Sequence, residues 1–123
     1  YKPLLETDVT RAVVDRYLFD GNLKPVPMEN ARLILKGEVT QFRRDPLRYQ
    51  SDNETVAEYR INIVVNMSLR DVQEDKILWE ENGFTGDSTY FTSGSSAKSD
   101  DQATQDAITD LARRIVERTV EAW

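Results

Sequence analysis

The chain has 123 residues, 39% of them hydrophobic and 31% charged, and this size and composition predict one globular domain, residues 1–123. It contains no Cys and no His, which excludes disulfides, thiolate and imidazole catalysis and nearly all zinc, copper and haem ligation, so we expect no cofactor and no metal. A net charge of -6 argues against nucleic acid as a partner, and no apolar run is long enough to span a bilayer.

The first segment predicts a helix. From Pro3 to Asp20 the apolar residues recur every three to four positions, which is the period of an amphipathic helix. Pro3 suits the first helical turn, and Gly21 supplies the left-handed residue that ends many helices. The next segment, residues 23–27, contains two prolines that lack amide donors, so it is a loop or at most a short strand at a sheet edge.

Three segments alternate apolar and polar side chains with the period of two that is typical of strands with one buried face. They are residues 31–42, 56–71 and 76–91. Gly83 and Gly86 interrupt the pattern of the third segment, which predicts bulges or bends at both positions. Strands that follow one another in this way are most simply antiparallel neighbours.

The last segment predicts a second helix. Ser99 and Gln102 have the spacing of a capping box, and the apolar run that follows continues with helical period to Trp123. The order of elements predicts an α+β two-layer sandwich, with two helices on one face of a three- to four-stranded, mainly antiparallel sheet. The other sheet face, which carries Arg60 and Asn62, is left polar and uncovered. A chain that opens with a helix also indicates that an N-terminal strand is missing.

Several groups of residues resemble catalytic sites, but structural roles explain them better. Glu80 and Glu81 are consecutive strand residues, so they point to opposite faces and cannot flank one bond. Asp100 and Asp101 interact favourably with a helix N-terminus. The serines around Lys98 lie in a loop with no scaffold to fix a nucleophile. We therefore expect no enzyme activity, and a carboxylate hydrolase is the least favoured interpretation.

The basic residues gather at two places. Arg43, Arg44 and Arg48 lie near the far end of the first predicted strand, with apolar side chains between them. Arginine binds phosphate bidentately, although a solvated hairpin end explains the pattern equally simply. Lys98 stands alone in the serine-rich loop beside a helix N-terminus, where backbone donors also favour anions.

Three strings resemble the lipopolysaccharide-assembly lipoprotein family, LptE-like: ARLILKGEVTQFRR, TVAEYRINIVVNMSLRD and KILWEENGFTGDSTYF. The most specific parts are residues 37–39, 57–60 and 78–81. The resemblance covers about the whole chain in element order. It implies one LptE-like domain truncated at its N-terminus, because the family has a strand and a lipidated cysteine before its first helix.

This resemblance implies a function. Family members are not enzymes; they are lipid-anchored on the periplasmic side of the outer membrane, where they plug and help to assemble a β-barrel translocon, LptD-like, that delivers lipopolysaccharide to the cell surface. The resemblance also implies that cationic side chains contact lipopolysaccharide in two loops. Lys98 matches the second place. At the first place, residues 49–53 carry no basic residue, so Arg48, Arg43 or Arg44 would have to serve.

An alternative interpretation is a periplasmic glycan- or small-ligand-binding module of another envelope complex, with Trp79, Tyr90 and Phe91 as stacking groups. For Trp79 we favour core packing, because a tryptophan at an alternating strand position usually fills a core.

Overall fold

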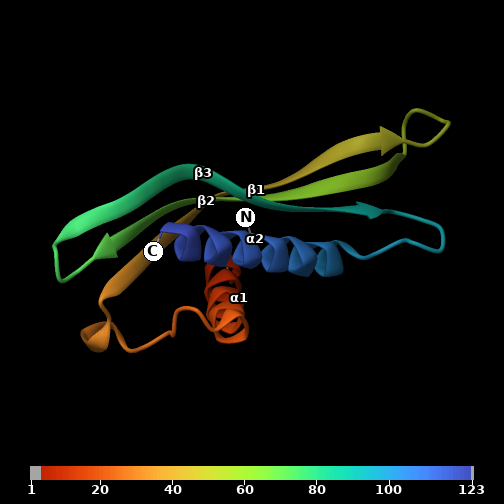
Figure 1. Ribbon diagram of the computed structural model, residues 1–123. Coiled ribbons are helices and arrows are strands. Elements are labelled where there is room, and N and C mark those ends of the chain that lie inside the picture. Colours follow the sequence, from red (N-terminus) through yellow and green to blue (C-terminus); the bar gives the residue numbers. More distant parts are fainter. Residues whose placement is uncertain (1–3, 123) are drawn as a thin grey trace.

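The computed structural model describes residues 4–122 (Figure 1). The elements follow the order α1 (Leu5–Asp20), a 3-10 helix at Met28–Asn30, β1 (Leu33–Tyr49), β2 (Val56–Asp71), β3 (Lys76–Phe91) and α2 (Asp100–Ala122). The predicted helix limits Pro3 and Trp123 lie outside the described residues.

The strands form one antiparallel sheet in the order β1-β2-β3. The α2 helix lies lengthwise along one face of this sheet, and α1 packs against α2 (Figure 1). The hydroxyls of Tyr17 on α1 and Thr119 on α2 are hydrogen-bonded at 2.6 Å. The predicted α+β sandwich is therefore confirmed with three strands in the described part of the chain, and the missing N-terminal strand stays a prediction.

The ends of both helices follow the local chemistry of the sequence. Gly21 has φ 78° and its amide donates to the Tyr17 carbonyl oxygen at 2.9 Å, a left-handed stop that a side chain would strain. The Ser99 Oγ accepts a hydrogen bond from the Gln102 amide at 3.0 Å, as the capping spacing predicts. Residues 23–27 form a loop, the first of the two predicted alternatives, and no edge strand.

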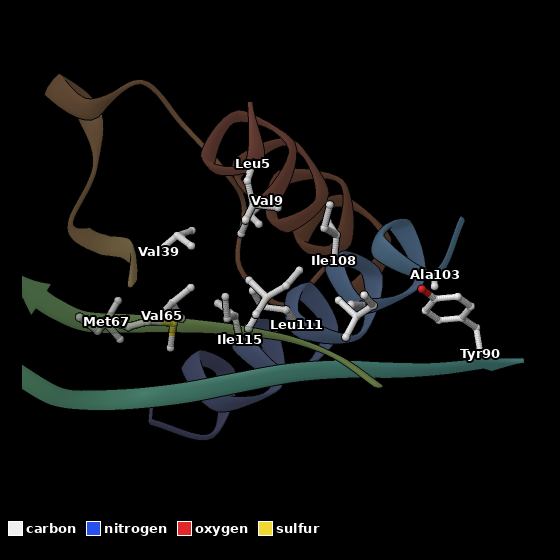
Figure 2. Packing of buried hydrophobic residues seen from close by; sticks show 14 of the residues in the cluster. Leu5, Val9, Val39, Val65, Met67, Tyr90, Ala103, Ile108, Leu111 and Ile115 are labelled. Carbon is white, nitrogen blue, oxygen red and sulfur yellow. The ribbon is translucent and has the colours of Figure 1, made fainter. Parts of the chain in front are cut away.

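The core lies between the sheet and the two helices. Alternate residues of β2 are at most 3% exposed: Ile61, Ile63, Val65, Met67 and Leu69. Leu111 and Ile115 of α2 and Leu5 and Val9 of α1 meet them from above the sheet (Figure 2). Burying each of these large side chains contributes about 1.5–3 kcal/mol, so the core and not helix propensity holds the two layers together.

The first strand is longer than the sequence predicts. It was expected over residues 31–42, but β1 continues to Tyr49, which pairs with Val56 of β2. Pro46 is tolerated because β1 is an edge strand, where a missing amide leaves no gap in the interior of the sheet. Arg43, Arg44 and Arg48 are therefore residues of β1, and each is paired with a residue of β2.

The two glycines of β3 have different roles. Gly83 has φ 74° and lies opposite the register shift between Val65 and Met67, which confirms the predicted bulge. Gly86, in contrast, pairs regularly with Ile63, so no bulge forms there. It lies directly beneath Leu111 of α2, where an added Cβ would be 2.4 Å from the Leu111 Cβ. Gly86 is needed for the close approach of the helix to the sheet.

Asp110 ties α2 to β3. Its carboxylate accepts a hydrogen bond from the Asp87 amide at 2.9 Å and forms ion pairs with Arg113 at 2.7 Å and Arg114 at 3.0 Å. Partial burial raises the pKa of Asp110, but the Asp87 amide and the two guanidinium groups outweigh burial and hold the pKa below the ordinary value of 3.8.

We expect Asp110→Asn to lower the free energy of unfolding at neutral pH by about 1.5–3 kcal/mol, the contribution usual for hydrogen bonds to a charged group. Because the pKa is depressed in the folded state, this stabilisation is present above the unfolded-state pKa near 3.8 and is lost as pH falls through the folded-state pKa. Urea denaturation at a series of pH values measures the effect. The difference between wild type and variant should shrink below about pH 4. A constant difference down to about pH 2.5 would contradict this assignment. Asp15→Asn, at an exposed position on α1, is the control.

Candidate functional site

The two predicted basic places lie toward the same end of the molecule. The loop after β3 begins beside the start of β2, where the Thr92 amide donates to the Ala57 carbonyl oxygen at 3.1 Å. The Lys98 amide donates to the Phe91 carbonyl oxygen at 3.2 Å, so the loop folds back beside the end of β3. Figure 1 shows this loop and the hairpin projecting on the same side. We call Arg43, Arg44, Arg48 and Lys98 the basic end.

Arg44 faces the helix layer. Its guanidinium lies 4.5 Å from the ring centroid of Tyr59, which stacks on Tyr90, and 4.0 Å from the Asp100 carboxylate. A hydrogen bond to the Tyr90 hydroxyl raises the pKa of Arg44. Arg44 therefore links β1 to the first turn of α2, and the Asp100 carboxylate lies close enough to compensate its charge.

Arg43 and Arg48 face the opposite side of the sheet. Arg43 pairs with Asp45 at 3.5 Å, and Arg48 pairs with Glu58 at 3.3 Å. The Arg48 side chain is 73% exposed, which leaves most of its donors available to a ligand. Since consecutive strand residues point to opposite faces, the structure separates Arg43 from Arg44 and does not form one three-arginine cluster.

Lys98 lies beside the first turns of α2. Its Nζ is 2.8 Å from the Asp106 carboxylate, and this hydrogen bond lowers the pKa of Asp106. The Lys98 side chain is about half exposed. An exposed pair of this kind contributes little to stability, so an anionic ligand can take the place of Asp106 at low cost.

Two further cations were not singled out as site residues. Lys36 and Arg60 are exposed on the sheet face that the helices do not cover, and neither forms an ion pair within residues 4–122. The alternation of β1 and β2 could have found them, because it places them on the polar side of each strand.

The uncovered sheet face carries mostly polar side chains on all three strands. Asn62 is buried on it and donates to the Asp45 carboxylate at 3.0 Å, while Asn66 and Ser68 continue the row along β2. We call this surface the open face. Both helices lie on the other side of the sheet (Figure 1).

The predicted stacking platform does not form. Trp79 and Tyr90 are 8% and 6% exposed and belong to the core, whereas Phe91 is 40% exposed. Trp79 packs beneath Arg118 of α2, whose guanidinium lies 4.7 Å from the ring centroid. The reason is the period of two in β3, which turns Tyr90 and Phe91 to opposite faces. The glycan-binding alternative thereby loses two of the three side chains on which it rested, Trp79 and Tyr90.

The catalytic alternatives also find structural explanations. Glu81 faces α2 and pairs with Arg118 at 3.1 Å, while Glu80 is exposed on the open face, as their positions predict. Asp100 begins α2 and accepts a hydrogen bond from the Tyr90 hydroxyl at 3.3 Å. Within residues 4–122 no three carboxylates converge as a metal site, and no helix is long and apolar enough to cross a membrane.

The architecture defines an α+β two-layer protein with one face of its sheet packed and the other free. Residues 1–120 match the family model for lipopolysaccharide assembly, LptE. The chain belongs to the LptE family of lipopolysaccharide-assembly proteins.

A solved structure supports the fold. A crystal structure of a candidate lipoprotein from Caulobacter crescentus CB15 is similar with a TM-score of 0.58 and 14% sequence identity, over 98% of this chain and 81% of that chain. At this identity the similarity concerns the fold alone. No curated protein matches the chain.

Proposed function

We propose that this protein is a non-enzymatic, lipid-anchored component of the outer membrane that plugs an LptD-like β-barrel from the periplasmic side and contacts lipopolysaccharide on its way to the cell surface. The observation that carries the proposal is the family match over residues 1–120. The geometry of the open face and of the basic end supports its two parts separately.

The open face supports enclosure by a larger protein. It is a broad, polar surface of a three-stranded sheet whose other face is packed. A polar sheet face suits a water-lined barrel interior, where each strand side chain can keep a hydrogen-bonding partner. An obligate plug would bury more than about 2,000 Å² in total.

Co-purification tests this part. When a lipidated full-length version is co-expressed with its barrel partner, we expect a stable complex that survives detergent extraction and size-exclusion chromatography. A protein that elutes as a free monomer in the presence of the barrel would overturn the proposal.

The basic end supports contact with phosphate groups. Arg48 and Lys98 are exposed and are held on a paired strand and beside a helix, so they can meet a ligand without reorganisation of the fold. Arg44 supports them as a positioning residue through Tyr59 and Asp100. Arg43, on the open face, lies on the same side of the sheet as Arg48.

We expect Arg48→Asp combined with Lys98→Asp to weaken binding of purified lipopolysaccharide at least tenfold, because two cations are replaced by anions facing its phosphates. Thermal unfolding should be nearly unchanged, since both side chains are exposed and their ion pairs are worth about 0–1 kcal/mol. The matched control is Arg70→Asp with Lys76→Asp, which makes the same charge change at the other end of the sheet, where both residues are also exposed and ion-paired. Equal affinity of the two double variants would contradict the assignment.

A further inference from the structure

A groove lies between α1, the loop 23–26 and the first half of β1. Its volume is about 530 Å³, within the range of roughly 300–1,000 Å³ of pockets that hold small ligands. Aliphatic side chains dominate its walls and floor, among them Val13, Val14, Leu23, Leu33, Leu35 and Met67. The groove exists because α1 packs mainly on α2 and scarcely touches β1.

Gly37 keeps the floor of this groove open. It pairs with Met67, whose side chain is buried on the helix-facing side of the sheet. Any side chain at position 37 would therefore point into the groove. Its φ is not in the left-handed region, and an added Cβ would meet only the Asn66 carbonyl oxygen, at 4.0 Å. Neither backbone conformation nor internal packing requires glycine here. A glycine inside a strand weakens it, and such a residue often marks the close approach of a ligand.

The floor determines which chemistry fits. It is formed by side chains on the helix-facing side of β1 and β2, and the unpaired edge of β1 runs along one side of it. A polypeptide backbone lying across these side chains, away from the edge of β1, would bury amide and carbonyl groups without partners, which is costly. A hydrocarbon chain carries no such groups, so it fits the groove without that penalty.

The charges at the rim favour an anionic head group. Lys24 is exposed at the groove and forms no ion pair within residues 4–122. Arg32, on the same segment leading into β1, carries a second positive charge and contacts Asp71 at 3.4 Å. The acidic lining residues are Glu6, in the first turn of α1, and Glu38, which follows Gly37 on β1 and pairs with Asn66, so strand alternation turns its side chain toward the open face.

We infer that this groove binds one fatty acyl chain of an anionic lipid, with the head group beside Lys24. The inference rests on the proposed function, since lipopolysaccharide is such a lipid, and it assigns the hydrocarbon to a place separate from the basic end.

Titration with 11-(dansylamino)undecanoate, competed with saturated fatty acids, tests the groove on the purified protein. We expect saturable binding with blue-shifted emission and competition that tightens up to about fourfold per added methylene, which corresponds to about 0.8 kcal/mol. Gly37→Ile should reduce the affinity at least tenfold by filling the floor, with an equal or higher melting temperature. Ser68→Ile, which adds the same side chain on the open face, should bind as wild type does. Absence of saturable binding to wild type, or equal binding by Gly37→Ile, would overturn the inference.

A second variant keeps the test decisive if Gly37→Ile does not fold. Val14→Glu puts a charge into the wall of the groove at a residue that is 38% exposed, so the core is spared. It should abolish probe binding, whereas Thr7→Glu on the same helix should not. The Arg48 and Lys98 double variant should still bind the acyl probe. If wild type binds the acyl probe but not lipopolysaccharide, the proposed function fails and this inference stands. If wild type binds lipopolysaccharide but not the acyl probe, this inference fails and the proposed function stands.

Discussion

Gly86→Ala is expected to lower the free energy of unfolding by about 3 kcal/mol, the upper end of the usual range for overpacking and more than most single substitutions on this chain. The new methyl group would be 2.4 Å from the Leu111 Cβ, 2.6 Å from its Cα and 2.7 Å from its backbone nitrogen. Two of these atoms belong to the backbone of α2, so no change of rotamer relieves the contact. The helix must move off the sheet, and the core between them opens.

Thermal unfolding followed by circular dichroism measures this effect, and a fall in Tm of roughly 10–20 °C is expected. Gly37→Ala is the matched control, because the same methyl group there meets only ordinary contact at 4.0 Å. It should leave Tm unchanged or raise it slightly. Equal Tm values for both alanine variants would mean that α2 does not lie as close to β3 as described.

Val64→Arg with Ser68→Arg is expected to reduce co-purification with the barrel partner more than tenfold while the isolated domain stays folded. Both residues lie on the open face of the central strand, which the proposal turns toward the barrel wall. Two long cations at a closed interface lose their hydration without gaining partners, which costs several kcal/mol, whereas on a free sheet face they remain in water.

The control for these variants is Gln105→Arg with Thr109→Arg, which adds the same charge on the exposed side of α2. The yield of complex after detergent extraction is the measured quantity. Normal yield from the open-face variant would place the barrel contact elsewhere. Equal loss from both pairs would mean that the partner surrounds the helix layer as well.

Much of the fold could be predicted from the sequence because its periodicities are strong. The alternation of residues 56–71 and the capping signals at Ser99 and Gly21 each led to the element observed. Residues 43–49 did not signal a strand, because Pro46 and the polar run around it lack alternation, and pairing with β2 determines their conformation. For a similar reason the role of Gly86 was not predicted: what requires glycine there is a helix residue 25 positions away in the chain.

The candidate site was predicted in position but not in its internal contacts. Residue type and spacing could place Arg48 and Lys98 near the ends of elements, yet they could not show that Tyr59, Tyr90 and Asp100 bind Arg44. Those partners come from three different elements and meet only after folding. The acyl groove had no sequence signal except a glycine inside a strand.

The sheet is longer than the helix that supports it. Strands of 16 or 17 residues at about 3.3 Å each reach roughly 55 Å, whereas the 23 residues of α2 at about 1.5 Å each reach roughly 35 Å. The far part of the β1–β2 hairpin therefore projects beyond both helices (Figure 1). With solvent on both sides, the turn at Asp52–Asn53 can accept a fluorophore or an epitope tag without disturbing the folding of the rest. A label there would report the distance between this arm and a membrane surface in the assembled complex.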